Sequence, residues 1–202
     1  MYEHYLDDFD FFHLGGDNMF VIAENLRYAA SLMDNSAPIY MGAAMVDKAK
    51  PQKLFCGGGA GYTLNRVALK RLIEEDFNRK RCLPNGTRSD EDRTIGGCLR
   101  ASIAWCHHNM DERNETRYHH FDVQFHAMWV QVHVSNWNWR ELWKFHGIDE
   151  GKEKLEGISS TSVSFHLVGD SDFRDRGLRR YHALLYNLCP GNASKLFVKA
   201  TP

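Results

Sequence analysis

Long apolar segments are missing from this sequence of 202 residues, which contains no run of eighteen apolar residues. We therefore expect no membrane-spanning helix within it. The first ten residues are acidic and aromatic, and they lack the basic stretch followed by an apolar stretch that marks a signal peptide. If the protein enters the secretory pathway, we expect its targeting element to lie outside this sequence.

An excess of charge of one sign is also missing. The net charge is −1 at pH 7, so no basic field is available for nucleic acid and no nucleic-acid partner is expected. The five cysteines include no C-x-x-C pair, which argues against a structural zinc site. Two disulfides with one free thiol, or no disulfide, both remain open. Three N-x-[ST] sequons, at Asn85, Asn114 and Asn192, mildly favour the secretory pathway.

What the sequence does have is the composition of one globular domain, with 43% hydrophobic and 25% charged residues. Asn65 is expected to cap a helix that has Leu69, Leu72 and Ile73 on one face. Strands are interleaved with helices, which favours an α/β domain. Strands are expected at residues 10–14, 39–41, 130–134 and 162–168. Residues 20–33 are expected to begin extended and turn helical, and further helices are expected to start after residue 65, to start at residue 89 and to cover residues 178–188. Loops are expected at residues 48–51 and 150–160.

Two glycine-containing segments could carry chemistry. Gly15-Gly16-Asp17-Asn18 follows the first expected strand, where a carboxylate could hold a divalent cation beside an approaching diphosphate. The same residue types also build ordinary turns. Residues 57–62, Gly-Gly-Gly-Ala-Gly-Tyr, would allow close approach of backbone to a ligand, although a tight turn explains them equally well.

Two further features could supply an acid, a base or a ligand. Ser89-Asp90-Glu91-Asp92 places three acids at a helix start, and one of them could act as a general base. A capping box explains the same pattern. His166 shares one face of its expected strand with Ser162 and Ser164, which leaves both a ligand role and an ordinary surface position open.

Taken in order, these segments resemble the Fringe-like β1,3-glycosyltransferases, most closely the core 1 β1,3-galactosyltransferases. The resemblance spans almost the whole chain and is weakest between residues 121 and 160. It rests on the segments DDFDFFHLGGDNMFVIAENLR, PIYMG, GGGAGYTLNRVALKRL, SDEDRTIGGCLR, ETRYHHF and TSVSFHLV, followed by RRYHALLYNLCP.

The resemblance implies the GT-A fold, a Rossmann-like α/β sandwich around a mainly parallel sheet that binds a sugar nucleotide at its strand ends. Residues 1–202 would form the C-terminal portion of a single GT-A catalytic domain, without its first strands and helices. The family also has an upstream membrane anchor and stem, so the resemblance implies the lumenal domain of a Golgi membrane protein. We expect the natural chain to extend upstream of Met1.

The resemblance also assigns roles to individual residues. Asp92 matches the catalytic base, and His166 matches the histidine that completes a Mn²⁺ site with Asp17 and Asn18. Gly16 and Asn18 stand where the family shows aspartates, which weakens that site. The donor and acceptor cleft would involve Gly58, Gly59, Ala60, Gly61, Tyr62, Glu91 and His119, with Trp137 and Trp139 as acceptor-stacking candidates and Cys82–Cys98 as a disulfide.

The implied reaction is inverting and Mn²⁺-dependent. Galactose would pass from UDP-galactose to N-acetylgalactosamine O-linked on a glycoprotein, forming a β1,3 linkage. Two alternatives are a Fringe-like transferase that uses UDP-N-acetylglucosamine and an inactive relative similar to the folding chaperone of the core 1 enzyme. A homodimer or a chaperone partner also remains open.

Overall fold

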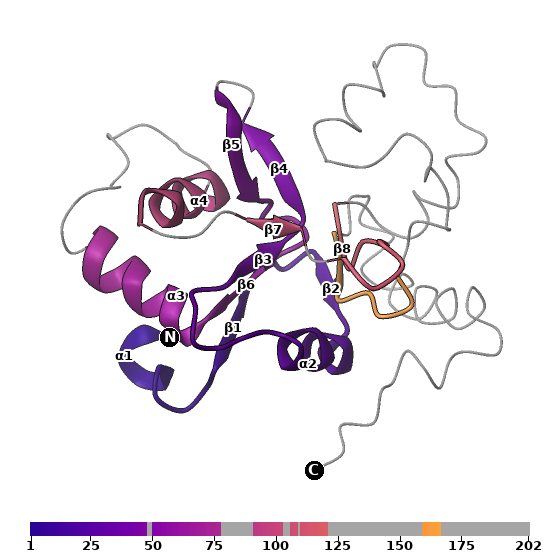
Figure 1. The fold of residues 1–202 in the computed structure, drawn as a ribbon, viewed down its shortest axis with the longest axis horizontal. Coiled ribbons are helices and arrows are strands. Elements are labelled where there is room, and N and C mark those ends of the chain that lie inside the picture. Colours follow the sequence, from indigo (N-terminus) through magenta and orange to yellow (C-terminus); the bar gives the residue numbers. More distant parts are fainter. Residues whose placement is uncertain (48–49, 78–90, 103–105, 109, 121–158, 167–202) are drawn as a thin grey trace.

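The computed structural model describes residues 1–47, 50–77, 91–102, 106–108, 110–120 and 159–166 (Figure 1). Its helices are α1 (Tyr2–Tyr5), α2 (Ala23–Ser31), α3 (Arg66–Arg71), the π-helix η1 (Leu72–Phe77) and α4 (Glu91–Ser102). Its strands are β1 (Phe11–Leu14), β2 (Met19–Val21), β3 (Tyr40–Gly42), β4 (Ala44–Asp47), β5 (Lys50–Cys56), β6 (Tyr62–Asn65), β7 (His107–His108), β8 (Tyr118–His119) and β9 (Ser164–His166). Among these helices, none has the length and apolar character needed to cross a membrane.

A four-stranded sheet of order β1-β6-β3-β7 occupies the middle of the described part (Figure 1). β6 pairs antiparallel with both β1 and β3, and β3 pairs parallel with β7. In the smaller sheet, of order β2-β9-β8, the first pair is antiparallel and the second parallel. β4 and β5 form an antiparallel hairpin, as a short connection requires. The expected α/β class is therefore found, but most pairings in the described residues are antiparallel, unlike the mainly parallel sheet that the resemblance implied.

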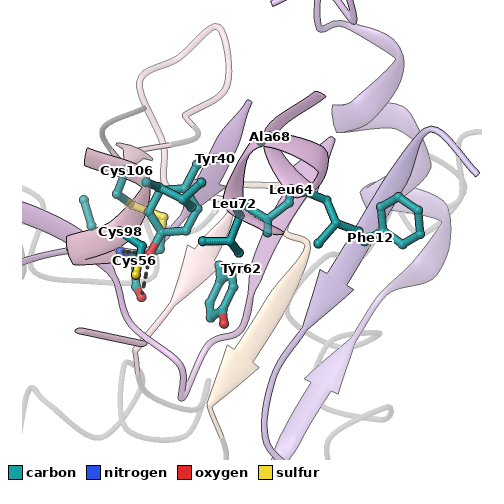
Figure 2. Close-up of a cluster of buried hydrophobic side chains, with 12 residues drawn as sticks. Phe12, Tyr40, Cys56, Tyr62, Leu64, Ala68, Leu72, Cys98 and Cys106 are labelled. Carbon is teal, nitrogen blue, oxygen red and sulfur yellow. Dashed lines mark hydrogen bonds between the residues drawn. A yellow bond between two sulfur atoms is a disulfide. The ribbon is translucent and has the colours of Figure 1, made fainter. Parts of the chain in front are cut away.

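Alternation along the strands divides the buried side chains into two layers, one on each face of the larger sheet. Tyr40 packs with Leu64 and Leu69 on the face that α3 and α4 cover, whereas its neighbour Met41 packs with Ala29 of α2 on the other face. Figure 2 shows the first layer, which consists of Phe12, Tyr40, Ala44, Cys56, Tyr62, Leu64, Ala68, Leu69, Leu72, Cys98, Leu99 and Cys106. The two layers hold the loops between the strands in fixed places.

Several local predictions are confirmed. The structure has β1 at the expected strand 10–14 and β3 at the expected strand 39–41. Residues 20–33, expected to begin extended and turn helical, contain the end of β2 followed by α2. Asn65 caps α3, because its side chain accepts a hydrogen bond from Ala68 N at 2.9 Å. The same oxygen accepts from Ile39 N at 2.9 Å, so this one buried side chain also ties α3 to the start of β3.

One expectation about local structure was wrong, and one strand was not expected. Of the loop placed at 48–51, Lys50 and Pro51 instead begin β5, and residues 48–49 lie outside the described residues. Residues 62–65, where no strand was expected, form β6, and Asn65 ends this strand and caps α3. Ser162 and Ser164, which alternation placed on one face with His166, are both buried, since Ser162 is 1% exposed and Ser164 is fully covered. The expected strand at 130–134 and helix at 178–188 lie outside the described residues, as does most of the 150–160 loop.

A disulfide joins the end of β5 to the segment before β7. Cys56 and Cys106 are bonded with their Cα atoms 5.2 Å apart, and both are buried beside Tyr40 (Figure 2). Cys98 is disulfide-bonded as well. Its expected partner, Cys82, lies outside the described residues. The Cys56–Cys106 bond was not predicted, because the sequence offered no spacing that selects this pair.

Candidate active site at the glycine turn

The glycine turn, residues 57–61, connects β5 to β6 and lies where several expected site residues meet. Gly61 N donates to Gly58 O at 3.0 Å, which closes the turn. Gly61 has a φ of 71° and is the one glycine with positive φ in the part of the chain described. A Cβ there would come within 2.8 Å of Leu14 O and 2.7 Å of His13 Nε2. Only glycine fits this position, so the turn is held in one conformation against β1.

Asp92 contacts the glycine turn from the first turn of α4. Its Oδ2 accepts a hydrogen bond from Gly58 N at 2.9 Å, and its Oδ1 accepts one from Arg93 N at 2.7 Å. Two backbone donors therefore fix the orientation of a half-buried carboxylate. Each carboxylate oxygen can accept a further hydrogen bond, so the group keeps the capacity to take a proton from a bound hydroxyl.

Glu91 is held next to Asp92 by a buried tyrosine. The Tyr62 hydroxyl donates to Glu91 Oε1, and the ring packs edge-on against Tyr40 with centroids 5.6 Å apart. Burial, followed by the hydrogen bond to Glu91, raises the pKa of Tyr62 above its ordinary value, so the phenol stays a donor at neutral pH. Tyr62 is fully buried, so its hydrogen bond to Glu91 connects the start of α4 to the core.

His166 contacts the glycine turn from β9. A Cβ on Gly59 would overlap the His166 ring at Nδ1, Cε1 and Cγ, so the ring lies directly against the backbone at that position. The ring Nδ1 is 3.2 Å from the carbonyl oxygen of His120, and this contact is a hydrogen bond only if Nδ1 carries the proton. In a neutral ring Nε2 is then the acceptor nitrogen.

Asn18 faces that acceptor nitrogen. Its Nδ2 lies 3.0 Å from His166 Nε2, although 148 residues separate the two in sequence. Asp17 is exposed beside it in the same β1–β2 turn. The antiparallel pairing of β2 with β9 creates this contact, because Met19 is opposite His166. The structure thus brings together two of the three residues expected to bind a cation.

Two of the expected residues, His166 and Asn18, could hold a Mn²⁺ ion after one change of orientation. A histidine that binds a metal through Nε2 normally donates its Nδ1–H to a carbonyl or carboxylate, and His166 has that arrangement. Asn18 would have to turn its amide oxygen, in place of its nitrogen, toward the cation. No group of three or more His, Cys, Asp and Glu side chains suited to a metal occurs within the described ranges, so a cation would depend on the Asn18 amide.

His119 occupies a different place from the one expected. It is only 3% exposed, its Nε2 is 2.9 Å from Ser162 Oγ, and its ring stacks on Phe165 with centroids 4.3 Å apart. His119 therefore packs against Phe165 of β9 and does not line the surface at the glycine turn. Ala60 is likewise fully buried, and its carbonyl accepts from Ser164 Oγ at 2.5 Å. Trp137 and Trp139 lie outside the described residues.

A buried polar chain that the sequence did not reveal supports the β1 side of the turn. His13 Nδ1 is 2.9 Å from Thr63 Oγ1, which is 2.8 Å from the Tyr118 hydroxyl. Desolvation by burial lowers the pKa of His13 to about 4, so the ring is neutral at pH 7. Alternation in β6 could have indicated that Thr63 faces away from Tyr62 and Leu64, but β6 was not expected as a strand.

Comparison with known proteins supports the relationship expected from the motifs. No family model matches the chain. It is 29% identical over 182 residues to glycoprotein-N-acetylgalactosamine 3-beta-galactosyltransferase 1 of Xenopus laevis. The matched residues cover 90% of this chain and 48% of that relative. It is 26% identical over 108 residues to chondroitin sulfate synthase 3 of Mus musculus and of Homo sapiens, covering 50% of this chain and 12% of those proteins. The chain thus spans about half the length of the first relative, and the resemblance to β1,3-galactosyltransferases is confirmed.

Proposed function

We propose that this relative of the glycoprotein-N-acetylgalactosamine 3-beta-galactosyltransferases is an inverting glycosyltransferase. The donor is UDP-galactose, the acceptor is N-acetylgalactosamine O-linked to a glycoprotein, and the product carries a β1,3 linkage. One observation carries the proposal: Asp92 and His166, assigned to different parts of one mechanism, contact the adjacent residues Gly58 and Gly59. The similarity over 90% of the chain to a named 3-beta-galactosyltransferase supports the choice of reaction.

Asp92 acts as the general base in this proposal. It takes the proton of the acceptor hydroxyl, whose oxygen then forms a bond to the anomeric carbon of galactose. The bond from that carbon to the diphosphate oxygen breaks in the same displacement, and UDP leaves with the bonding electrons. Gly58 N keeps the carboxylate in one orientation through its hydrogen bond, so the base need not be ordered during the reaction. Attack opposite the leaving group inverts the anomeric configuration.

His166, Asn18 and Asp17 would hold Mn²⁺ beside the glycine turn. When bound, Mn²⁺ would supply positive charge to the diphosphate leaving group. His166 contributes Nε2, because its Nδ1 is directed at the His120 carbonyl. The backbone of Gly59 packs against the ring and limits its rotation. Asn18 supplies an amide oxygen where the family has a carboxylate, so we expect weaker Mn²⁺ binding than by an all-aspartate site.

We place the protein in the Golgi lumen. The disulfide between Cys56 and Cys106 and the oxidised state of Cys98 support an oxidising compartment. The three sequons point in the same direction.

The test is a transfer assay with purified protein. Radiolabelled UDP-galactose and UDP-N-acetylglucosamine are compared as donors, with a peptide carrying N-acetylgalactosamine on threonine as the acceptor. Galactose transfer that requires Mn²⁺ and stops with EDTA is expected, and β1,3-galactosidase should release the sugar. Transfer of N-acetylglucosamine alone would move the protein to the other Fringe-like donor class.

A second candidate is a non-enzymatic, chaperone-like relative. The specific observation in its favour is the contact between Asn18 and His166 Nε2, which joins two of the expected metal ligands to each other. Titration calorimetry with UDP and Mn²⁺ separates the two candidates. Tight UDP–Mn²⁺ binding would exclude the chaperone-like role, whereas absence of binding together with co-purification of an active galactosyltransferase would replace the proposed activity.

A further inference from the structure

Residues 110–116 form a tight, outward-directed turn that the proposed reaction does not use. Met110 and Thr116 form an isolated antiparallel bridge, and Asp111 N donates to Glu115 O at 3.0 Å. The chain reverses at Asn114, whose N donates to Asp111 O at 2.9 Å and whose φ is 62°. Asparagine accepts this left-handed backbone better than most residues do, so the reversal requires no strained side chain.

The base of this turn is firmly held. Asp111 Oδ2 accepts from Ser159 Oγ at 2.6 Å. Arg117 is only 2% exposed, and it donates through Nε to Thr161 Oγ1 at 3.0 Å and through an Nη to Met110 O at 2.6 Å. The base of the turn is therefore bound to the segment before β9, and a change at its tip need not be transmitted to β8.

The tip of the turn, in contrast, is exposed. Glu112, Arg113 and Asn114 are all exposed, while Thr116 is half-buried. A large group attached at Asn114 would therefore cover no surface that the core needs. Asn114-Glu115-Thr116 is also an N-x-T tripeptide with no proline, the acceptor pattern for an N-linked glycan. Position and chemistry thus coincide at one residue, and the oxidised cysteines indicate the compartment in which such a glycan is added.

We propose that Asn114 carries an N-linked oligosaccharide. The bond formed joins Asn114 Nδ2 to the anomeric carbon of the reducing-end sugar of a lipid-pyrophosphate-linked oligosaccharide. The bond from that carbon to the pyrophosphate oxygen breaks, the amide nitrogen loses one proton, and the lipid pyrophosphate leaves. The cell's oligosaccharide-transferring enzyme performs this step, so the modification does not depend on the protein's own activity.

The experiment expresses the chain behind a cleavable secretion signal in a eukaryotic cell and maps the lumenal protein. Cleavage before aspartate releases residues 111–121, which contain this sequon alone. The glycan is removed enzymatically in isotope-labelled water, which converts an occupied asparagine into labelled aspartate. A Cys56–Cys106 linked peptide in the same digest, prepared without reductant, shows that the sampled chain had reached the oxidising compartment.

Labelled aspartate at position 114 is the expected result. The label should be lost in Thr116→Val, which removes the hydroxyl but keeps Asn114, and retained in Thr116→Ser, which preserves the sequon. Asn114→Asp, which still suits a positive φ, should lose one glycan by gel mobility without loss of secretion. Oxidised chain in which residues 111–121 are found wholly unmodified would overturn the proposal.

Discussion

Replacing Gly59 by alanine tests whether the glycine turn positions His166. The added methyl group would overlap the imidazole at Nδ1, Cε1 and Cγ. Among the described glycines, Gly61 is the one with a positive φ. Gly59 does not have a positive φ, so backbone strain does not complicate its substitution by alanine. The ring cannot move aside without cost, because its Nδ1 lies 3.2 Å from His120 O and its Nε2 lies 3.0 Å from Asn18 Nδ2.

Two routes can relieve this overlap, and they have similar magnitudes. If the backbone of the turn shifts, the overpacking costs about 1–3 kcal/mol of stability. If the His166 ring turns away, the two hydrogen bonds are lost at about 0.5–1.5 kcal/mol each. The second route displaces Nε2 from the proposed cation position. Of the two contacts, only the one with His120 O is also present in the proposed cation-bound form, and its loss weakens Mn²⁺ binding by roughly 2- to 13-fold.

The assay measures Mn²⁺ affinity by calorimetry and stability by urea unfolding for Gly59→Ala and for a matched control. Gly97→Ala is that control: it lies within α4, a Cβ there has no heavy atom within 4 Å, and alanine should stabilise the helix by about 0.5–1 kcal/mol. Native Mn²⁺ affinity together with native stability in Gly59→Ala would refute the packing of His166 on the turn.

Two further predictions concern stability. Removing the Cys56–Cys106 disulfide by changing both cysteines to alanine should lower the free energy of unfolding by up to about 4 kcal/mol, because the bond closes a loop across 50 residues; an unchanged urea midpoint would contradict this. The half-buried His13 has a folded-state pKa of about 4 against its ordinary 6.5, so the unfolded state binds the proton first and stability falls by up to about 3 kcal/mol as the pH drops from 6.5 to 4. His13→Asn should flatten that part of the pH–stability profile, and an equally steep profile in the variant would show that another group is responsible.

Features set by neighbouring residues were predictable from the sequence. Asn65 was expected as a helix cap, and the structure confirms it, since an N-cap depends on three or four consecutive residues. The glycine turn was identified from composition, and the need for glycine at Gly61 follows from its positive φ. Motif order also indicated that Asp92 and His166 belong to one site, although nothing local connects them.

Features set by distant contacts could not be predicted. The contact of Asn18 with His166 depends on the register of β2 against β9, and the Cys56–Cys106 pairing depends on how β5 lies beside the segment before β7. The resemblance implied a cleft position for His119, yet stacking on Phe165 buries it. Alternation predicts which face of a strand a side chain lies on, but not whether that face is covered. The burial of Ser164 in β9 could therefore not be predicted.

The measurement that tests the central claim most directly is the turnover number of Asp92→Asn in the galactose-transfer assay. Asparagine can still accept the hydrogen bond from Gly58 N through its amide oxygen, so the contact with the turn is kept while the base is lost. The hydrogen bond from Arg93 N is lost as well, because the amide nitrogen cannot accept it. We predict that kcat falls by about 10²- to 10⁴-fold with nearly unchanged UDP–Mn²⁺ affinity. A kcat equal to that of the unmodified protein would contradict the assignment of Asp92 as the base that the glycine turn positions.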